Sequence, residues 1–244
     1  MKVALITGAS GAIGRETALK FINDGYFTVG QYNNGGDRME NFVSALKNEN
    51  KSDYFFPFRA DLKSAKDCAA LAEFTLENFG HTDVFVSVAG TDVYKLCTET
   101  TEKEWDDVFS VNAKSAFLLT KSLLPAMTER KKGALLYVSS IWGVAGACME
   151  TAYSASKAAL IGFCKAIAKE VAPSGITANC VCPGVIDTPM NARFSAEETA
   201  ELIERTPLGR LGTAKEIADL IFFLCTGAPF VTGQAITADG GFIL

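Results

Sequence analysis

A tyrosine and a lysine stand four residues apart, at Tyr153 and Lys157, in a stretch that contains no proline. Four residues is close to one helical turn, so a helix would place both side chains on one face. A free phenol loses its proton near pH 10, and a neighbouring ammonium group favours the phenolate. Such a pair could exchange a proton with an alcohol or carbonyl oxygen near neutral pH. On its own such a pair is common and is more typical of a surface pair on a helix.

Two further polar residues belong to elements that would bring them to the same place. Ser140 follows an apolar run at 134–139 that predicts a strand, and it precedes Tyr153 by 13 residues. Asn112 lies within a long predicted helix at 102–124. In parallel sheets ligands bind at the carboxyl ends of the strands, which is where Ser140 would lie.

Strand-like and helix-like segments alternate along the whole chain. Alternation of this kind indicates crossover connections and a parallel sheet covered on both faces. We therefore predict a single α/β domain over 1–244, a Rossmann-like doubly wound parallel sheet of about seven strands flanked by helices. A polar segment with two prolines at 186–211 interrupts the alternation and would suit a substrate lid. Strands are expected at 3–7, 27–32, 54–60, 84–88, 134–139, 176–182 and 234–238, and helices at 13–23, 39–47, 65–79, 102–124, 153–171, 196–205 and 214–225.

Three glycines follow the first predicted strand at intervals of three residues, namely Gly8, Gly11 and Gly14. Glycine allows the backbone to approach a pyrophosphate closely, and the start of the next helix supplies free amides. A plain strand-to-helix turn would also use glycine. The position at the first such turn of an α/β chain favours a dinucleotide site.

The end of the second predicted strand would contact the adenosine ribose. Residues 31–34 contain no acid, and Asp37 lies beyond the strand. An acid there would repel a 2′-phosphate, whereas Arg15 could pair with one and Asn33 could border it. These residues favour NADP(H) over NAD(H).

Composition excludes several classes of protein. The net charge of -5 argues against a nucleic-acid partner and gives no support for a membrane contact. No run of 18 apolar residues occurs, and residues 1–8 lead directly into the glycine turn, so neither a membrane span nor a secretory signal is expected. A single histidine and the absence of a Cys-x-x-Cys pair argue against a metal site. The seven cysteines are odd in number and predict reduced thiols in a cytoplasmic protein: Cys68, Cys97, Cys148, Cys164, Cys180, Cys182 and Cys225.

Together these motifs resemble the short-chain dehydrogenase/reductase family, and the resemblance covers essentially the whole chain. Several independent motifs occur in the family's order and spacing. They are Thr7-Gly8-Ala9-Ser10-Gly11-Ala12-Ile13-Gly14, Asp61-Leu62, Ala89-Gly90, Val111-Asn112, Ser139-Ser140, Tyr153 with Lys157, Asn179 with Pro183-Gly184 and Thr188, and Asp239-Gly240-Gly241.

The resemblance implies a role for each catalytic position. Tyr153 would be the general acid in reduction, and Lys157 would lower its pKa and bind the nicotinamide ribose. Ser140, chosen over Ser139 by its spacing to the tyrosine, would hydrogen-bond the substrate oxygen. Asn112 would hold a water in a proton relay. The implied cofactor contacts are Gly8, Ser10, Gly11, Ile13, Gly14, Arg15, Asn33, Asp61, Leu62, Ala89, Gly90, Tyr153, Lys157, Pro183, Gly184, Ile186 and Thr188.

Two positions depart from the family pattern. Ala12 replaces a glycine of the turn, with Gly11 just before it. Ser87 and Val88 replace a pair of asparagines that tie the sheet to the cofactor site. The first departure puts the fit of a phosphate in doubt, and the second puts local stability in doubt.

Within the family the chain is most similar to the 3-oxoacyl-acyl-carrier-protein reductases, on its length, the stretches at 187–190 and 207–212, and the tail from Val231. This implies reduction of a 3-oxoacyl thioester in fatty-acid biosynthesis, with acyl carrier protein as a possible partner. The basic run 130–132 lies near the family's docking arginine, but Ser174 replaces a second one.

The sequence leaves other substrates and functions open. The substrate could be a different alcohol or ketone, such as a sugar, a hydroxysteroid or a small hydroxyacyl compound. A non-catalytic nucleotide-binding protein is a more remote alternative. The family also implies a homotetramer, with helices 102–124 and 153–171 in one interface. We expect the apolar tail 242–244 to pack on a neighbouring subunit.

Overall fold

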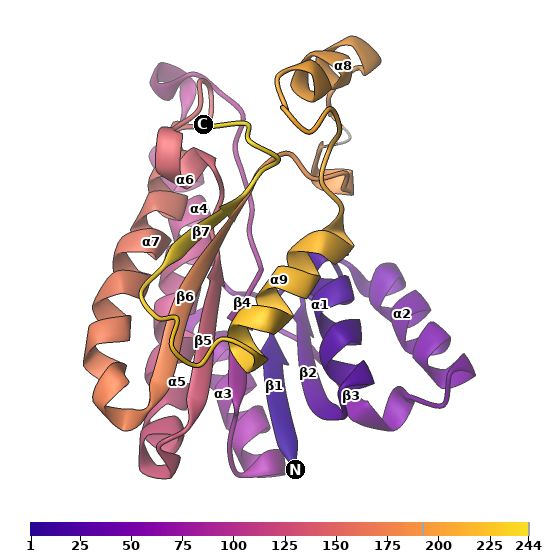
Figure 1. The fold of residues 1–244 in the computed structure, drawn as a ribbon, viewed down its shortest axis with the longest axis vertical. Helices are drawn as coiled ribbons and strands as arrows, with labels where there is room; N and C mark the ends of the chain where they lie inside the picture. Colours follow the sequence, from indigo (N-terminus) through magenta and orange to yellow (C-terminus); the bar gives the residue numbers. More distant parts are fainter. Residues whose placement is uncertain (192, 244) are drawn as a thin grey trace.

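The computed structural model describes residues 1–191 and 193–243, and at its centre lies a sheet of seven parallel strands (Figure 1). The strand order is β3-β2-β1-β4-β5-β6-β7, so the direction of winding reverses between β1 and β4. This confirms the predicted doubly wound α/β fold. The strands are β1 (Lys2–Ile6), β2 (Tyr26–Tyr32), β3 (Phe55–Arg59), β4 (Val84–Ser87), β5 (Gly133–Val138), β6 (Ile176–Pro183) and β7 (Ala235–Ala238).

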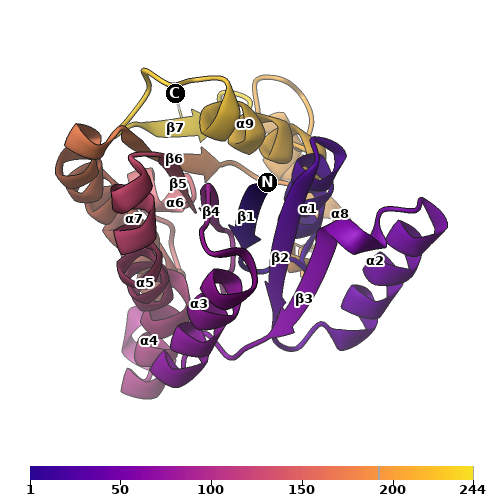
Figure 2. The same ribbon diagram turned by 90° about the horizontal axis from the view of Figure 1, so that it is seen from below.

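Helices cover both faces of the sheet, as the view along the strands shows (Figure 2). One layer consists of α1 (Ala12–Asn23), α2 (Gly36–Asn48) and α9 (Ala214–Thr226), and the other of α3 (Ala65–Phe79), α4 (Glu102–Phe109), α5 (Ser115–Arg130) and α7 (Thr151–Val171). Each layer has its own apolar core against the sheet.

The central strand β1 shows why the strands read as continuous apolar runs. Ala4 and Ile6 pack into the core under α1 and α9, whereas Leu5 packs into the core under α3 and α5. All three are fully buried. Successive side chains of a strand point to opposite faces, so a strand that is covered on both sides must be apolar at every position.

The long helix that the sequence predicts over 102–124 is divided, and this prediction was wrong in detail. It begins at Thr101, whose hydroxyl accepts from the amide of Glu104, and α4 ends at Phe109. A π-helical turn, η3 (Ser110–Lys114), leads into α5, which continues past Pro125 to Arg130. Proline usually ends a helix because it lacks the amide proton, but tertiary packing overrides that preference here.

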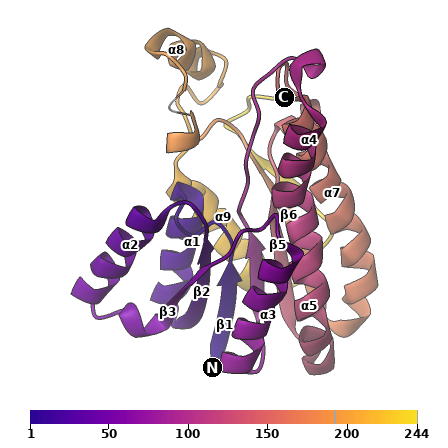
Figure 3. The same ribbon diagram turned by 180° about the vertical axis from the view of Figure 1, so that it is seen from behind.

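The segment between β6 and α9 lies beyond the carboxyl ends of the strands (Figure 3). It contains the short helices η5 (Pro189–Asn191) and α8 (Ala196–Glu204). The short helix α6 (Trp142–Ala145), which follows β5, lies at the same end of the sheet. A capping box between Ser195 and Glu198 begins α8. The predicted lid at 186–211 is therefore at the end of the sheet where parallel α/β proteins bind ligands.

Candidate active site

The turn between β1 and α1 packs too tightly for side chains at two of its glycines. Gly8 has a φ of +69°, and a methyl group there would lie 2.9 Å from the Cα of Ala89. A methyl group on Gly14 would lie 2.2 Å from the carbonyl oxygen of Gly8. The glycine spacing therefore reflects two close backbone approaches, one to the segment after β4 and one within the turn.

Two side chains hold this turn in place. The Thr7 hydroxyl accepts from the amides of Val88 (3.0 Å) and Ala89 (3.1 Å). The buried amide of Gln31 accepts from the Gly8 amide at 2.9 Å through its oxygen and donates to Ala60. The link between the turn and β4 is thus made by backbone amides, so it does not depend on the asparagines that this chain lacks.

The start of α1 is open to an anion. Gly11 is the N-cap residue, and Ala12 begins the helix. Within this described segment the first turn of α1 has neither a side-chain cap nor an acidic residue. Free amides and the helix dipole at such an end favour phosphate. Ala12 is the first residue of α1, and the close backbone approaches of the turn occur at Gly8 and Gly14 instead.

Three residues converge at the end of β2. A methyl group built on Gly35 would lie 2.4 Å from Ser10 Oγ and 2.9 Å from Arg38 Nη2. Arg38 lies in the first turns of α2 and was not singled out by the sequence. Arg15, which the sequence did single out, is an exposed residue of α1 with its guanidinium 3.5 Å from Glu16.

The predicted adenine contacts lie after β3. Asp61 accepts from the amide of Lys63 at 3.0 Å and is half-buried. Leu62 is 4% exposed, and its side chain packs into the core under α3. Asn33 follows β2 and is half-buried, and Ile13 packs partly against the core under α1.

Tyr153 and Lys157 lie one helical turn apart in α7, as their spacing predicts. The Lys157 Nζ donates to the carbonyl oxygen of Val138, the last residue of β5, at 2.8 Å. It lies 5.5 Å from the centre of the Tyr153 ring. A methyl group on Gly90 would be 3.2 Å from this ammonium, so Gly90 leaves room for the lysine.

The two serines after β5 have different partners. Ser139 donates to the Lys157 carbonyl oxygen at 2.8 Å and fixes β5 to α7. Ser140 Oγ accepts from the amide of Trp142 at 3.1 Å, and the serine lies close enough to the Tyr153 phenol to lower the pKa of that group. Of the two serines, Ser140 is the one that influences the pKa of Tyr153, and it is also the one that the 13-residue spacing favours.

Asn112 lies in the π-helical turn and is fully buried. Its Nδ2 donates to the carbonyl oxygen of Thr91 at 2.8 Å and to Ser156 Oγ at 2.9 Å. Its Oδ1 accepts from the Thr91 amide at 2.8 Å. Asn112 therefore joins the loop after β4 to α7, next to Lys157. Single-turn π segments occur often at functional sites.

Burial controls the protonation of the central pair. It raises the pKa of the Tyr153 phenol above its ordinary value, and the hydrogen bond from Ser140 only partly opposes this. Burial also lowers the pKa of Lys157 to about 8. Removal of the phenol from water is the largest influence on the Tyr153 pKa, and it opposes the lowering expected beside a cation.

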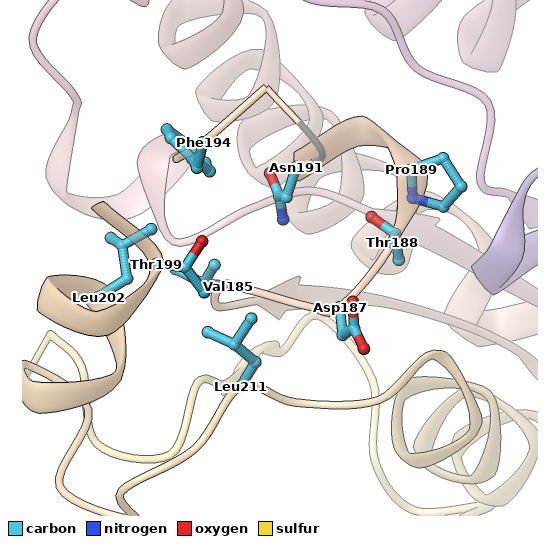
Figure 4. A pocket seen from close by; sticks show the side chains of 9 residues that line it. All are labelled: Val185, Asp187, Thr188, Pro189, Asn191, Phe194, Thr199, Leu202 and Leu211. Carbon is cyan, nitrogen blue, oxygen red and sulfur yellow. The ribbon is translucent and has the colours of Figure 1, made fainter. Parts of the chain in front are cut away.

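The residues that follow β6 form a further part of the site. Pro183 is the last residue of β6, and a methyl group on Gly184 would lie 2.6 Å from the Cα of Asp239. Ile186 is buried, and Thr188 borders a cavity of about 390 Å³. In Figure 4, Asp187, Thr188 and Pro189 face Phe194, Thr199 and Leu202 across this cavity.

Other predicted features lie away from this group. Arg130 and Lys132 approach Asp83 at 3.3 and 3.4 Å, at the amino ends of the strands and therefore opposite the catalytic end of the same chain. Phe242 packs edge-on against Trp142 of its own chain at 5.7 Å, and Leu244 lies outside the described residues. All seven cysteines are free thiols, and Cys97 and Cys148 are exposed.

The described residues contain no cluster of metal-ligating side chains and no helix long and apolar enough to cross a membrane. A doubly wound sheet with a glycine turn where the winding reverses, and with a buried serine and lysine beside a half-buried tyrosine at the carboxyl ends, defines a Rossmann-like fold with an acid–base site.

Comparison with known proteins narrows this class. A family model described as enoyl-(acyl carrier protein) reductase matches residues 8–243. The 3-oxoacyl-[acyl-carrier-protein] reductase FabG of Thermotoga maritima is 35% identical, over 100% of this chain and 98% of the relative. The protein of the same name from Staphylococcus aureus is 34% identical, over 98% of this chain and 97% of the relative. The one from Buchnera aphidicola is 32% identical, over 98% of this chain and 96% of the relative. The chain therefore belongs to the short-chain dehydrogenase/reductase family.

Proposed function

We propose that the chain is an NADP(H)-dependent oxidoreductase that reduces a 3-oxoacyl thioester to the 3-hydroxyacyl form. The observation that carries this proposal is the convergence of Ser140, Tyr153 and Lys157 at the carboxyl end of β5, with Asn112 beside Lys157. A hydroxyl pair of this kind suits protonation of a carbonyl oxygen. Relatives named 3-oxoacyl-[acyl-carrier-protein] reductase, which align over the whole chain, support the substrate class.

The residues around the β1–α1 turn fit a nicotinamide dinucleotide. Gly8 and Gly14 keep the turn free of side chains, and the open start of α1 suits a pyrophosphate. Ser10 and Arg38 would hold a 2′-phosphate, because a guanidinium pairs well with phosphate oxygens. The site residues proposed from the family pattern, from Gly8 to Thr188, would hold the rest of the cofactor.

When bound, the reduced nicotinamide supplies a hydride to the carbonyl carbon. Tyr153 donates its phenol proton to the carbonyl oxygen, and Ser140 holds that oxygen by a hydrogen bond. Because burial raises the pKa of Tyr153, the phenol keeps its proton at neutral pH and is ready to donate. Lys157 and Asn112 would return a proton to Tyr153 through a relay that starts at the buried ammonium group.

We extend the proposal to the assembly and its surroundings. The chain would act in the cytoplasm as a homotetramer that uses α4, α5 and α7, where Phe117 is 47% exposed. Segment 186–211 would act as the substrate lid, and acyl carrier protein would present the substrate. Because Arg130 and Lys132 lie at the amino ends of the strands, opposite the catalytic end of their own chain, any carrier protein that they contact would have to serve the site of another subunit.

The experiment follows the absorbance of NADPH and, separately, of NADH at 340 nm, which is about the absorption maximum of reduced nicotinamides. Acetoacetyl-CoA tests ketone reduction, and crotonyl-CoA tests the alkene reduction that the family model's description names. We expect NADPH oxidation with acetoacetyl-CoA alone. Tyr153→Phe is the matched control, since it removes only the proposed proton donor. Turnover of sugars or hydroxysteroids instead would contradict the substrate class, and cofactor binding without any turnover would contradict the catalytic role.

A further inference from the structure

A cluster of three charged side chains lies near Tyr153. Arg193, from the segment between η5 and α8, pairs with Asp92 through Nη1 and with Glu150 through Nη2. Its guanidinium carbon lies 4.8 Å from the ring centre of Tyr94. We call Asp92, Glu150 and Arg193 the charge cluster. Its members come from three separate segments, so its arrangement is set by the fold.

The charge cluster is attached to the catalytic group at two points. Glu150 is the N-cap residue of α7, three residues before Tyr153, and its side chain is 6% exposed. Asp92 follows Thr91, whose amide and carbonyl both hydrogen-bond to Asn112. The two carboxylates are therefore held beside the phenol by the same elements that hold the catalytic residues.

The charges of the cluster act on the tyrosine itself. Among the smaller influences on the pKa of Tyr153, Glu150 and Asp92 raise it and Arg193 lowers it, after burial and the Ser140 hydrogen bond. Burial raises the pKa of the Glu150 carboxyl, and Arg193 opposes that shift. The guanidinium thus favours a buried carboxylate in its ionised form next to the reaction site.

Two carboxylates and one guanidinium leave the cluster with a formal charge of -1. The guanidinium is already engaged on both of its terminal nitrogens. Lys95, whose backbone amide donates to the residue before Glu150, is paired with Glu104. A substrate carboxylate arriving here would meet a net negative charge. To bind Arg193 it would have to displace an internal carboxylate and leave that group buried without a partner.

We propose that the charge cluster selects against 3-oxo carboxylates, so that the site accepts the uncharged carbonyl of an ester or thioester and rejects the free acid. This inference rests on the proposed function and identifies Glu150 and Asp92 as specificity-determining residues. A free 3-oxo acid and its thioester share the reacting ketone and differ in the charge two carbons away. Discrimination by a fixed like charge needs no additional contact with the favoured substrate.

The test compares acetoacetate with methyl acetoacetate, which have the same 3-oxobutanoyl core and differ in one negative charge. The quantity measured is the ratio of kcat/KM for the ester to kcat/KM for the acid, with NADPH in excess. We expect the wild-type ratio to favour the ester strongly. Glu150→Gln keeps the shape of the side chain, removes one negative charge and releases one side of Arg193. It should lower the ratio about tenfold, which corresponds to about 1.4 kcal/mol of differential binding.

Asp92→Asn is the second variant and should shift the ratio in the same direction, which keeps the test valid if Glu150→Gln folds poorly. Asp219→Asn is the matched control, because it removes a carboxylate from α9 that pairs with Lys20 and Lys215 away from the site. A purely structural role for the cluster would lower both kcat/KM values together and leave their ratio unchanged. If Glu150→Gln and Asp92→Asn both have the same ratio as Asp219→Asn, the inference is overturned. Reduction of the ester by these proteins would still support the proposed function. Turnover of neither compound nor of acetoacetyl-CoA would overturn both.

Discussion

Replacing Lys157 by methionine should make the cofactor-free protein more stable and remove its activity. Lys157 of α7 is buried, and among the described residues its ammonium makes one hydrogen bond, to the Val138 carbonyl oxygen. A buried charge without an ionised partner costs folding free energy. Methionine has nearly the same length and no charge, so Lys157→Met removes this cost without leaving a cavity.

The pKa of Lys157 gives the magnitude. Burial lowers it from 10.5 to about 8, and each pKa unit corresponds to about 1.4 kcal/mol. The charged form therefore destabilises the native state by about 3 kcal/mol at pH 7. Loss of the hydrogen bond to Val138 costs about 1 kcal/mol. The variant should accordingly gain about 2 kcal/mol in the free energy of unfolding at pH 7.

The free-energy penalty of the buried Lys157 ammonium decreases as pH rises. Because the pKa in the folded state is below that in the unfolded state, the penalty is complete below pH 8, where both states are protonated. It fades between pH 8 and 10.5 as the native state and then the unfolded state lose the proton. The stability advantage of Lys157→Met should thus fall by about 3 kcal/mol over this interval.

The assay is urea unfolding of the cofactor-free protein at fixed protein concentration, from pH 7 to 10.5, for wild type and variant. Lys165→Met provides the control, because Lys165 is exposed on the same helix and its ammonium stays in water. A difference between Lys157→Met and wild type that stays constant across this pH range would refute the reasoning. It would mean that the ammonium is solvated in the native state.

Three other substitutions test separate parts of the molecule. Tyr153→Phe should reduce kcat by at least about a hundredfold, since it removes the proton donor, and should leave the Kd for NADPH, measured by fluorescence titration, nearly unchanged. Arg38→Gln should raise the KM for NADPH about tenfold and leave the KM for NADH unchanged, because only the 2′-phosphate contact is lost; an equal change in both would contradict the assignment. Asp83→Asn should destabilise the protein at neutral pH by about 1–3 kcal/mol. Although burial would raise the pKa of Asp83, the Val3 amide and neighbouring cations lower it overall, so its contribution is present above about pH 4 and is lost as pH falls further. Thermal unfolding at pH 7 and pH 3 checks this, and an undiminished difference at pH 3 would argue against it.

The layered fold was predictable because each element carries a strong local signal. The apolar run at 3–6 has to be a strand covered on both faces, and the structure buries its alternate residues in two different cores. The spacing of Tyr153 and Lys157 needed only a helix to bring them together. The prediction failed where packing outweighs local preference, since α5 runs through Pro125 and the chain adds a π-helical turn at Asn112.

The residues missed by the sequence analysis are those whose partners are distant in the chain. Gln31 reaches back to the Gly8 amide, and Arg38 meets Ser10 across the end of β2. Arg193 meets carboxylates 101 and 43 residues away. No periodicity or short motif records such contacts, because they depend on which loops the sheet topology brings to one edge. Arg38 was the easiest of these to predict, because it lies only six residues after the end of β2, where a cofactor ribose contact was expected.

The buried polar groups of this chain favour an enzyme over a nucleotide-binding protein that has no catalytic activity. The glycine turn and the open start of α1 would be enough to bind a dinucleotide. The chain also buries Asn112, Ser139 and Lys157, each at 3% exposure or less, and satisfies each with specific hydrogen bonds. Apolar residues of similar size at these places would stabilise the same fold. These three buried polar residues lower the stability of the fold, and they lie near Tyr153. Such a loss of stability is expected at a site where residues are kept for catalysis.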